Sequence, residues 1–162
     1  MNDTTVIVEP GTNEVRAVRV FEAPRELVFA TMMDPKEIPN WWGPARLTTT
    51  VDRMEPRAGG SWRYEQRDRD GTVHGFHGVY HDVQAPERVV MTFEYEGAPG
   101  HVLMTTADFE DLGGGRTRLT QSSVYQSVAD RDAMVATGME SGLREGMDRI
   151  AALVERARTP LG

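Results

Sequence analysis

Alternating apolar and polar side chains run through the middle of this chain. Trp62 and Tyr64 occupy one phase of the alternation, and Arg63 and Glu65 occupy the other. A period of two is typical of a strand with one buried face. The alternation recurs from residue 47 to about residue 125 between short turn sequences, so we predict six strands joined as an antiparallel meander.

Turn-forming residues separate these predicted strands. Each turn contains Gly or Pro, which suit tight reversals of the chain, and the predicted turns lie at residues 68–71, 85–88, 97–100 and 113–115. One further strand is predicted earlier, over residues 15–21. The expected sheet therefore has six to seven strands.

Helix signals flank the predicted sheet on both sides. Pro24 suits the first turn of a short helix, and residues 34–35 begin a second one that Pro39 is expected to end. A capping sequence at 127–130 begins a long final helix, which residues 159–160 should end. Apolar residues recur along this helix at intervals of three and four and make one stripe: Val135, Met139, Leu143, Met147, Ile150, Val154 and Ala157.

These elements predict an α+β helix-grip fold, in which a curved antiparallel sheet wraps around a long C-terminal helix. Two short helices follow the first strand. We expect one domain over residues 15–158, and a flexible lead-in over residues 1–14. Such a fold can leave a cavity between the sheet and the helix.

The final helix contains Gly138, Gly142 and Gly146 at intervals of four residues. A glycine inside a helix costs about 1 kcal/mol relative to alanine, so three on one stripe need a reason. Either another backbone packs closely against them, or they leave room for a ligand. The sequence favours neither alternative.

Composition excludes several classes of function. The 162 residues carry a formal net charge of −7 and a pI near 5.1, which argues against a nucleic-acid surface. No apolar run approaches the roughly 20 residues that span a bilayer, and we expect no membrane insertion. The chain has no cysteine, so it has neither a disulfide nor a thiolate metal site. We therefore expect a soluble cytoplasmic protein without a cofactor.

Six short segments resemble a known family, in order along the chain. They are residues 19–24 (RVFEAP), 41–44 (WWGP), 78–80 (GVY), 85–90 (APERVV), 115–120 (GRTRLT) and 138–143 (GMESGL). Together they resemble the START-like SRPBCC superfamily, in the branch named after the activator of heat-shock-protein-90 ATPase. The resemblance covers nearly the whole chain and implies the helix-grip fold. It also implies that the cavity commonly holds an apolar or aromatic small molecule.

The strand phases nominate residues that would contact such a ligand. Large apolar side chains on the helix-facing side either line a pocket or simply fill the core, and polar groups there would orient a ligand. The candidate ligand-binding residues are Trp42, Trp62, Tyr64, Phe76, Tyr80, Met91, Phe93, Tyr95, Phe109, Gln121, Met139, Gly142 and Leu143. Which of Trp41 and Trp42 faces the cavity stays open.

Catalytic and metal sites are not evident. His77 and His81 share a face but lie roughly 13 Å apart on a strand, too far for one ion, and we expect both to face outward. His74 falls in the inward phase, close to a turn. Ser141 lies inside a predicted helix and lacks the strand-to-helix turn of a nucleophile elbow, so no catalytic residues are assigned.

Three functions remain open at this point. The first is binding of a small hydrophobic or aromatic molecule. The second is a cyclase or aromatase-like enzyme acting on an aromatic or polyketide-type substrate, which would need a titratable residue in the cavity. The third is a protein-interaction module related to a chaperone ATPase activator, with a second copy of the chain or another protein as partner.

Overall fold

The computed structural model describes residues 2–156, which form eight strands and four helices. In chain order these elements are β1 (Thr5–Ile7), β2 (Glu14–Phe21), α1 (Arg25–Met32), α2 (Ile38–Trp41), β3 (Thr48–Met54), β4 (Ser61–Arg67), β5 (Val73–Gln84), β6 (Arg88–Tyr95), β7 (Val102–Gly113), β8 (Arg116–Val124), α3 (Val128–Ala136) and α4 (Met139–Arg156).

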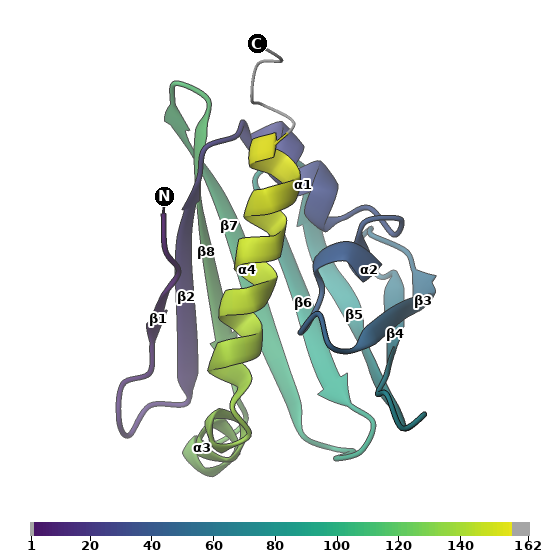
Figure 1. Cartoon of the computed structure of the whole chain (residues 1–162). Helices are drawn as coiled ribbons and strands as arrows, with labels where there is room; N and C mark the ends of the chain where they lie inside the picture. The colour runs from purple at the N-terminus through teal and green to yellow at the C-terminus, as the bar shows by residue number, and fades with distance from the viewer. Residues whose placement is uncertain (1, 157–162) are drawn as a thin grey trace.

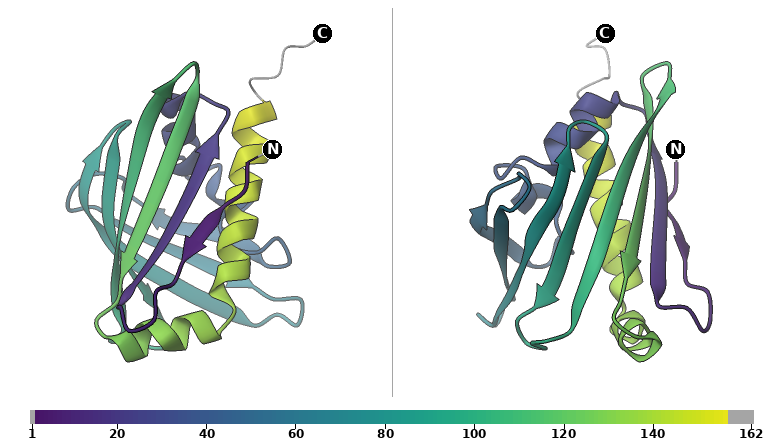
Figure 2. Two further views of the ribbon diagram at one scale, coloured as in Figure 1. Left: turned by 90° about the vertical axis from the view of Figure 1, so that its left-hand side faces the viewer. Right: turned by 180° about the vertical axis from the view of Figure 1, so that it is seen from behind.

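The strands form a single antiparallel sheet in the order β1-β2-β8-β7-β6-β5-β4-β3. Strands β3 to β8 are the predicted meander, and β2 pairs with β8. The sheet curves, and α4 crosses one of its faces with α3 at one end, α1 at the other and α2 beside β3 (Figures 1 and 2). This confirms the helix-grip fold.

The number of strands is one more than the upper expectation. The segment predicted as a lead-in contains β1, which pairs with β2 through Thr5↔Val18 to Ile7↔Arg16. Its neighbour Thr4 is buried. A three-residue strand is too short for its periodicity to be recognised, so this edge strand could not be predicted from alternation.

The second short helix differs from its prediction. Residues 34–35 precede α2 in a turn, and Pro39 lies in the first turn of the helix instead of ending it. A proline is tolerated there because the first amide groups of a helix have no partner inside it. The sequence placed the proline at the wrong end of this helix.

The predicted long final helix is two helices. Ser127 caps α3 as expected, by accepting a hydrogen bond from the Asp130 amide. Gly138 then adopts φ +85°, a left-handed conformation that ends α3, and α4 leaves at a different angle (Figure 1). The predicted helix end at 159–160 lies outside the described residues.

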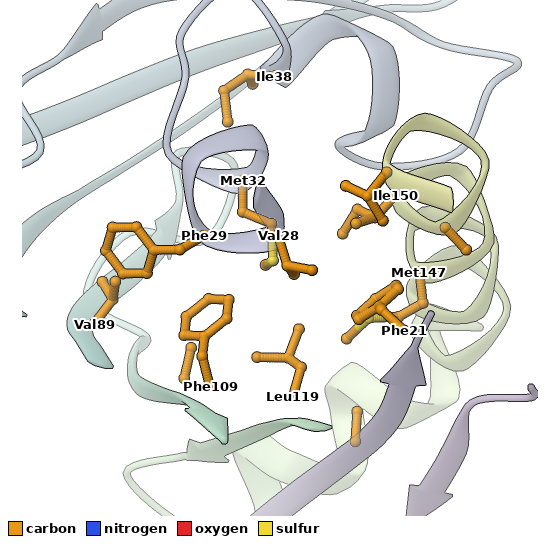
Figure 3. Packing of buried hydrophobic residues seen from close by; sticks show 14 of the residues in the cluster. Phe21, Val28, Phe29, Met32, Ile38, Val89, Phe109, Leu119, Met147 and Ile150 are labelled. Atoms are coloured by element: carbon orange, nitrogen blue, oxygen red, sulfur yellow. The ribbon is translucent and has the colours of Figure 1, made fainter. Parts of the chain in front are cut away.

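The apolar core lies under the C-terminal half of α4. Met147, Ile150, Ala151 and Val154 are buried there, together with side chains from α1 and the sheet. Figure 3 shows Met147 and Ile150 facing Val28, Phe109 and Leu119 among others. Each fully buried large aliphatic side chain contributes roughly 1.5–3 kcal/mol, so this half of α4 is firmly seated.

Two buried arginines fix the helices to the edge of the sheet. Arg19 of β2 is 2% exposed, and its Nη1 lies 2.7 Å from Asp148 Oδ1 on α4. Arg131 of α3 is equally buried, and its Nη1 donates to the carbonyl oxygens of Glu9 and Glu14, each at 3.0 Å. Both arginines therefore join a C-terminal helix to the N-terminal strands.

Substituting two of the glycines should change stability in opposite directions. Gly138→Ala should lower the free energy of unfolding by about 1 kcal/mol, because an L-residue is strained at positive φ. No atom lies within 4 Å of an added Cβ there, so the conformation alone accounts for the loss. Gly142→Ala should raise it by about 0.5–1 kcal/mol, because Gly142 lies inside α4.

Urea unfolding monitored by circular dichroism measures both changes. An equal effect of the two substitutions would contradict the assignment of Gly138 as the residue that separates the two helices.

Candidate functional site

A cavity of about 710 Å³ lies between the sheet and the N-terminal half of α4. Strands β4 to β8 supply its floor and walls. The loop between α2 and β3 and the junction of α3 with α4 complete it. Met147 and Ile150 of the core also line it, so the cavity adjoins the apolar core under α4.

Most of the predicted ligand-binding residues line this cavity. These are Trp42, Tyr64, Phe76, Tyr80, Met91, Phe93, Phe109, Gln121, Met139, Gly142 and Leu143. Trp62 and Tyr95 do not line it. Trp41 and Trp42 both line the cavity, so both tryptophans face it.

Trp62 is covered by its neighbours and is only 1% exposed. Its indole lies over Gly78, its pairing partner on β5, where any Cβ would collide with the Thr92 carbonyl and the indole nitrogen. The Trp62 Nε1 reaches across β5 to donate to the Thr92 carbonyl on β6 at 3.2 Å. Trp62 is thus part of the sheet's packing instead of the cavity wall.

Tyr95 lies at the end of β6, beyond the cavity. Its hydroxyl is 3.0 Å from His74 Nδ1, and its ring packs 5.2 Å from that of Phe76. The alternation placed Tyr95 on the correct face, but the strand extends past the cavity wall. Sequence phase gives the face of a residue and not its position along the cavity.

Trp42 is the centre of an aromatic wall. Its ring lies 5.0 Å from that of Tyr64 and 5.2 Å from that of Phe76, both edge-on, and 6.3 Å from that of Phe93. Ring pairs in such geometries are stabilised by more than the burial of their surface alone. The rings of β4, β5 and β6 thereby form one continuous surface with the loop that follows α2.

The glycines of α4 allow that loop to approach the helix. A Cβ at Gly146 would lie 3.3 Å from the Trp41 carbonyl oxygen, whereas at Gly142 the nearest atom is Pro44 Cδ at 3.9 Å. Arg149 Nη1 donates to the Gly43 carbonyl at 2.9 Å. Gly146 therefore serves close packing against the loop, and Gly142 leaves space at the cavity.

Polar groups interrupt the apolar floor on β7 and β8. The hydroxyls of Thr105 and Ser123 lie 3.0 Å apart, on residues that pair directly. The side-chain amide of Gln121 lines the cavity with no hydrogen-bond partner among residues 2–156. Gln66 also lines it, but its Nε2 is held by the Thr49 hydroxyl at 3.4 Å.

The tyrosines of the cavity are neutral hydrogen-bonding groups. Burial raises the pKa of Tyr80 to about 12, although a hydrogen bond with Tyr64 lowers it in part. Burial likewise raises the pKa of Tyr64, and it raises the pKa of Tyr125 to about 12. None of these hydroxyls is activated as a base at neutral pH.

The histidines of β5 lie away from the cavity. His77 is on the outer face, as the alternation predicts, with its Nδ1 2.8 Å from Glu96 Oε2 and its Nε2 3.3 Å from Glu94 Oε1. Arg63 binds the same Glu96 carboxylate through Nε at 2.8 Å. His81 is exposed, at a shift in the β5–β6 register.

Several lining residues were not nominated from the sequence. Met32 and Ile38 come from the short helices and Met134 comes from α3, while Met33 and Thr137 directly follow α1 and α3. The local sequence around these residues does not show that their helices pack against the cavity. Gln66, in contrast, shares the phase of Trp62 and Tyr64, so the alternation could have identified it.

Comparison with known proteins places the chain in a family. The model for activator of Hsp90 ATPase homolog 1-like proteins matches residues 22–155. The chain belongs to this family. No curated protein matches it by sequence.

Solved bacterial structures share the fold. A protein from Arthrobacter aurescens is 27% identical, with a TM-score of 0.86 over 98% of this chain and 93% of its own. One from Rhodobacter sphaeroides is 22% identical, with a TM-score of 0.85 over 95% and 99%. One from Chromobacterium violaceum is 27% identical, with a TM-score of 0.79 over 88% and 97%.

The described residues contain neither a metal-binding group of side chains nor a membrane-spanning helix. Within residues 2–156, no three His, Cys, Asp or Glu side chains are grouped so that they could hold a metal ion. No helix in that range is long and apolar enough to cross a membrane.

The outer-face ion cluster predicts a pH-dependent contribution to stability. Hydrogen bonds from Arg63 and His77 lower the pKa of Glu96 from its usual 4.5 to about 2. A lowered carboxylate pKa stabilises the fold above about pH 4.5, and this contribution is lost as the pH falls toward 2. Glu96→Gln should therefore lower the free energy of unfolding at pH 7 by about 1 kcal/mol, and by less at pH 3.

Urea unfolding at the two pH values measures this difference. The control is Glu110→Gln, which removes the exposed pair with Arg118 and should change stability by less than about 0.5 kcal/mol. A loss for Glu96→Gln that is the same at both pH values would refute the role of the ionised carboxylate.

Proposed function

We propose that this protein binds a small hydrophobic or aromatic molecule between its sheet and α4. The observation that supports the proposal is the cavity of about 710 Å³ with its aromatic wall. Ligand sites commonly measure about 300–1,000 Å³ and combine apolar walls with a few polar groups. The cavity meets both descriptions.

The aromatic wall would supply most of the affinity. A ligand that buries about 200 Å² of apolar surface gains roughly 5 kcal/mol from leaving water, before the costs of association. The rings that contact Trp42 edge-on would also make directional contacts with a flat aromatic ligand. Aromatic ligands are therefore favoured over flexible aliphatic chains of equal area.

The enzyme alternative has less support. A cyclase-like reaction needs a titratable group in the cavity. Glu145 lines the cavity, but the histidine that lies beside carboxylates, His77, is on the opposite face of the sheet. The tyrosines that line the cavity have raised pKa values. Binding without turnover is the simpler role for such a site.

The interaction alternative has no specific observation in its favour. The large apolar side chains that are exposed among residues 2–156 are distributed over β1, β5, β7, β8 and α3: Ile7, Val73, Val79, Met104, Val124 and Val128. Only Met104 and Val124 pair with each other. Ligand binding is therefore the function that we propose. The cysteine-free sequence supports a cytoplasmic location for it.

A neutral fluorescent probe tests the proposal. N-phenyl-1-naphthylamine should gain fluorescence on binding to the protein, and Gly142→Leu should weaken this binding at least tenfold because the new side chain occupies the cavity. The matched control is Ala152→Leu, at an exposed position of the same helix, which should bind the probe like the wild type.

Circular dichroism must show that both variants are folded. No fluorescence gain with the wild type, or equal binding by Gly142→Leu, would refute the proposed site.

A further inference from the structure

Three polar side chains of the cavity lie together on two neighbouring strands. Thr105 lies on β7, and Gln121 and Ser123 lie on β8, whereas the aromatic wall lies on β4, β5 and β6. We call the three residues the polar ledge. A ligand that spans the cavity would meet rings on one side and hydrogen-bonding groups on the other.

The ledge is close to the nearest ring of the wall. Thr105 pairs with Met91 on β6, and Phe93 is two residues further along the same strand. Diagonal neighbours of this kind are roughly 7–8 Å apart. A ring packed against Phe93 can therefore carry a substituent toward Thr105, and Gln121 on β8 is the next diagonal neighbour of Thr105.

Gln121 is the least satisfied member of the ledge. Its neighbours across the sheet are Ala17 on β2 and Ala107 on β7, which offer only methyl groups. Its amide has no hydrogen-bond partner among the described residues. A polar group in such surroundings requires water or a ligand.

The hydroxyl pair adds to this capacity. When Thr105 and Ser123 bond to each other, one hydroxyl hydrogen and several lone pairs stay free. Together with the Gln121 amide, the ledge can both donate and accept hydrogen bonds. It carries no charge.

The charges near the cavity do not favour an anionic ligand. The charged side chains among its described lining residues are Arg46 and Glu145, which are opposite in sign. Arg46 has 67% of its side chain exposed and lies 3.9 Å from Asp68. The ledge residues themselves include no cation that would offset the loss of hydration of a carboxylate.

We propose that the cavity selects uncharged aromatic compounds that carry a carbonyl or similar neutral hydrogen-bonding group, and that Gln121 binds this group. The proposal rests on the proposed function and specifies its ligand class. Gln121 would determine specificity, because an unpaired amide penalises analogues that lack the polar group.

Two nearly isosteric probes test the role of Gln121. 2-Acetylnaphthalene carries a ketone, and 2-isopropenylnaphthalene replaces its oxygen with a CH₂ group. The dissociation constant of each is measured by displacement of N-phenyl-1-naphthylamine, from the wild type and from Gln121→Leu. The alkene-to-ketone ratio of dissociation constants should fall about threefold to tenfold in the variant, the value of one neutral hydrogen bond. Differences in hydration of the probes cancel in this comparison.

The matched control is Ser122→Ala, which alters the neighbouring residue on the opposite face of β8 and should leave the ratio unchanged. If Gln121→Leu does not fold, Gln121→Met provides the same test. At pH 7, 2-naphthoate should bind the wild type at least tenfold more weakly than the ketone.

The outcomes separate the two proposals. If the wild type binds neither naphthalene nor the displaced probe, the proposed function fails and the ligand class fails with it. If both neutral probes bind but their ratio is the same in wild type and variant, or if 2-naphthoate binds most tightly, only the ligand class is overturned.

Discussion

The C-terminal half of helix α4 packs against the apolar core, and this packing holds the N-terminal half of the helix above the sheet. Met147, Ile150 and Val154 are buried against α1 and the sheet. Arg19 adds a charge-assisted contact at 2.7 Å to Asp148, a kind of hydrogen bond that is stronger than one between neutral groups. The N-terminal half makes fewer contacts with the sheet, and the cavity occupies the space beneath it.

The loop between α2 and β3 determines whether this space is a cavity or an open groove. It is held by backbone contacts that depend on the helix sequence: Gly146 lets the Trp41 carbonyl approach, and Arg149 binds the Gly43 carbonyl. The same loop delivers Trp42 onto the rings of the sheet. The position of this loop thus determines both the closure of the cavity and the completion of its aromatic wall.

In the proposed ligand site, one side would supply affinity and the other would supply selectivity. Aromatic rings on β4 to β6 would bind almost any flat apolar molecule, because burial of apolar area is not directional. Hydrogen bonds at Gln121 and its neighbours are directional and carry a penalty when they are unmade. Family membership and the fold shared with bacterial relatives place this arrangement on a known architecture.

The sequence by itself determined the meander, the helix-grip fold and the inward phase of residues such as Tyr64 and Phe93, because alternation and turn chemistry are local properties of the chain. It could not show that Trp62 is covered or that Gly138 divides the final helix. The burial of Trp62 depends on contacts between segments distant in sequence. The helix break depends on the φ angle of Gly138, which the spacing of apolar residues does not reveal. Only the tertiary structure decided which inward-facing side chains meet empty space, since a cavity is what the packing of all the elements leaves unfilled.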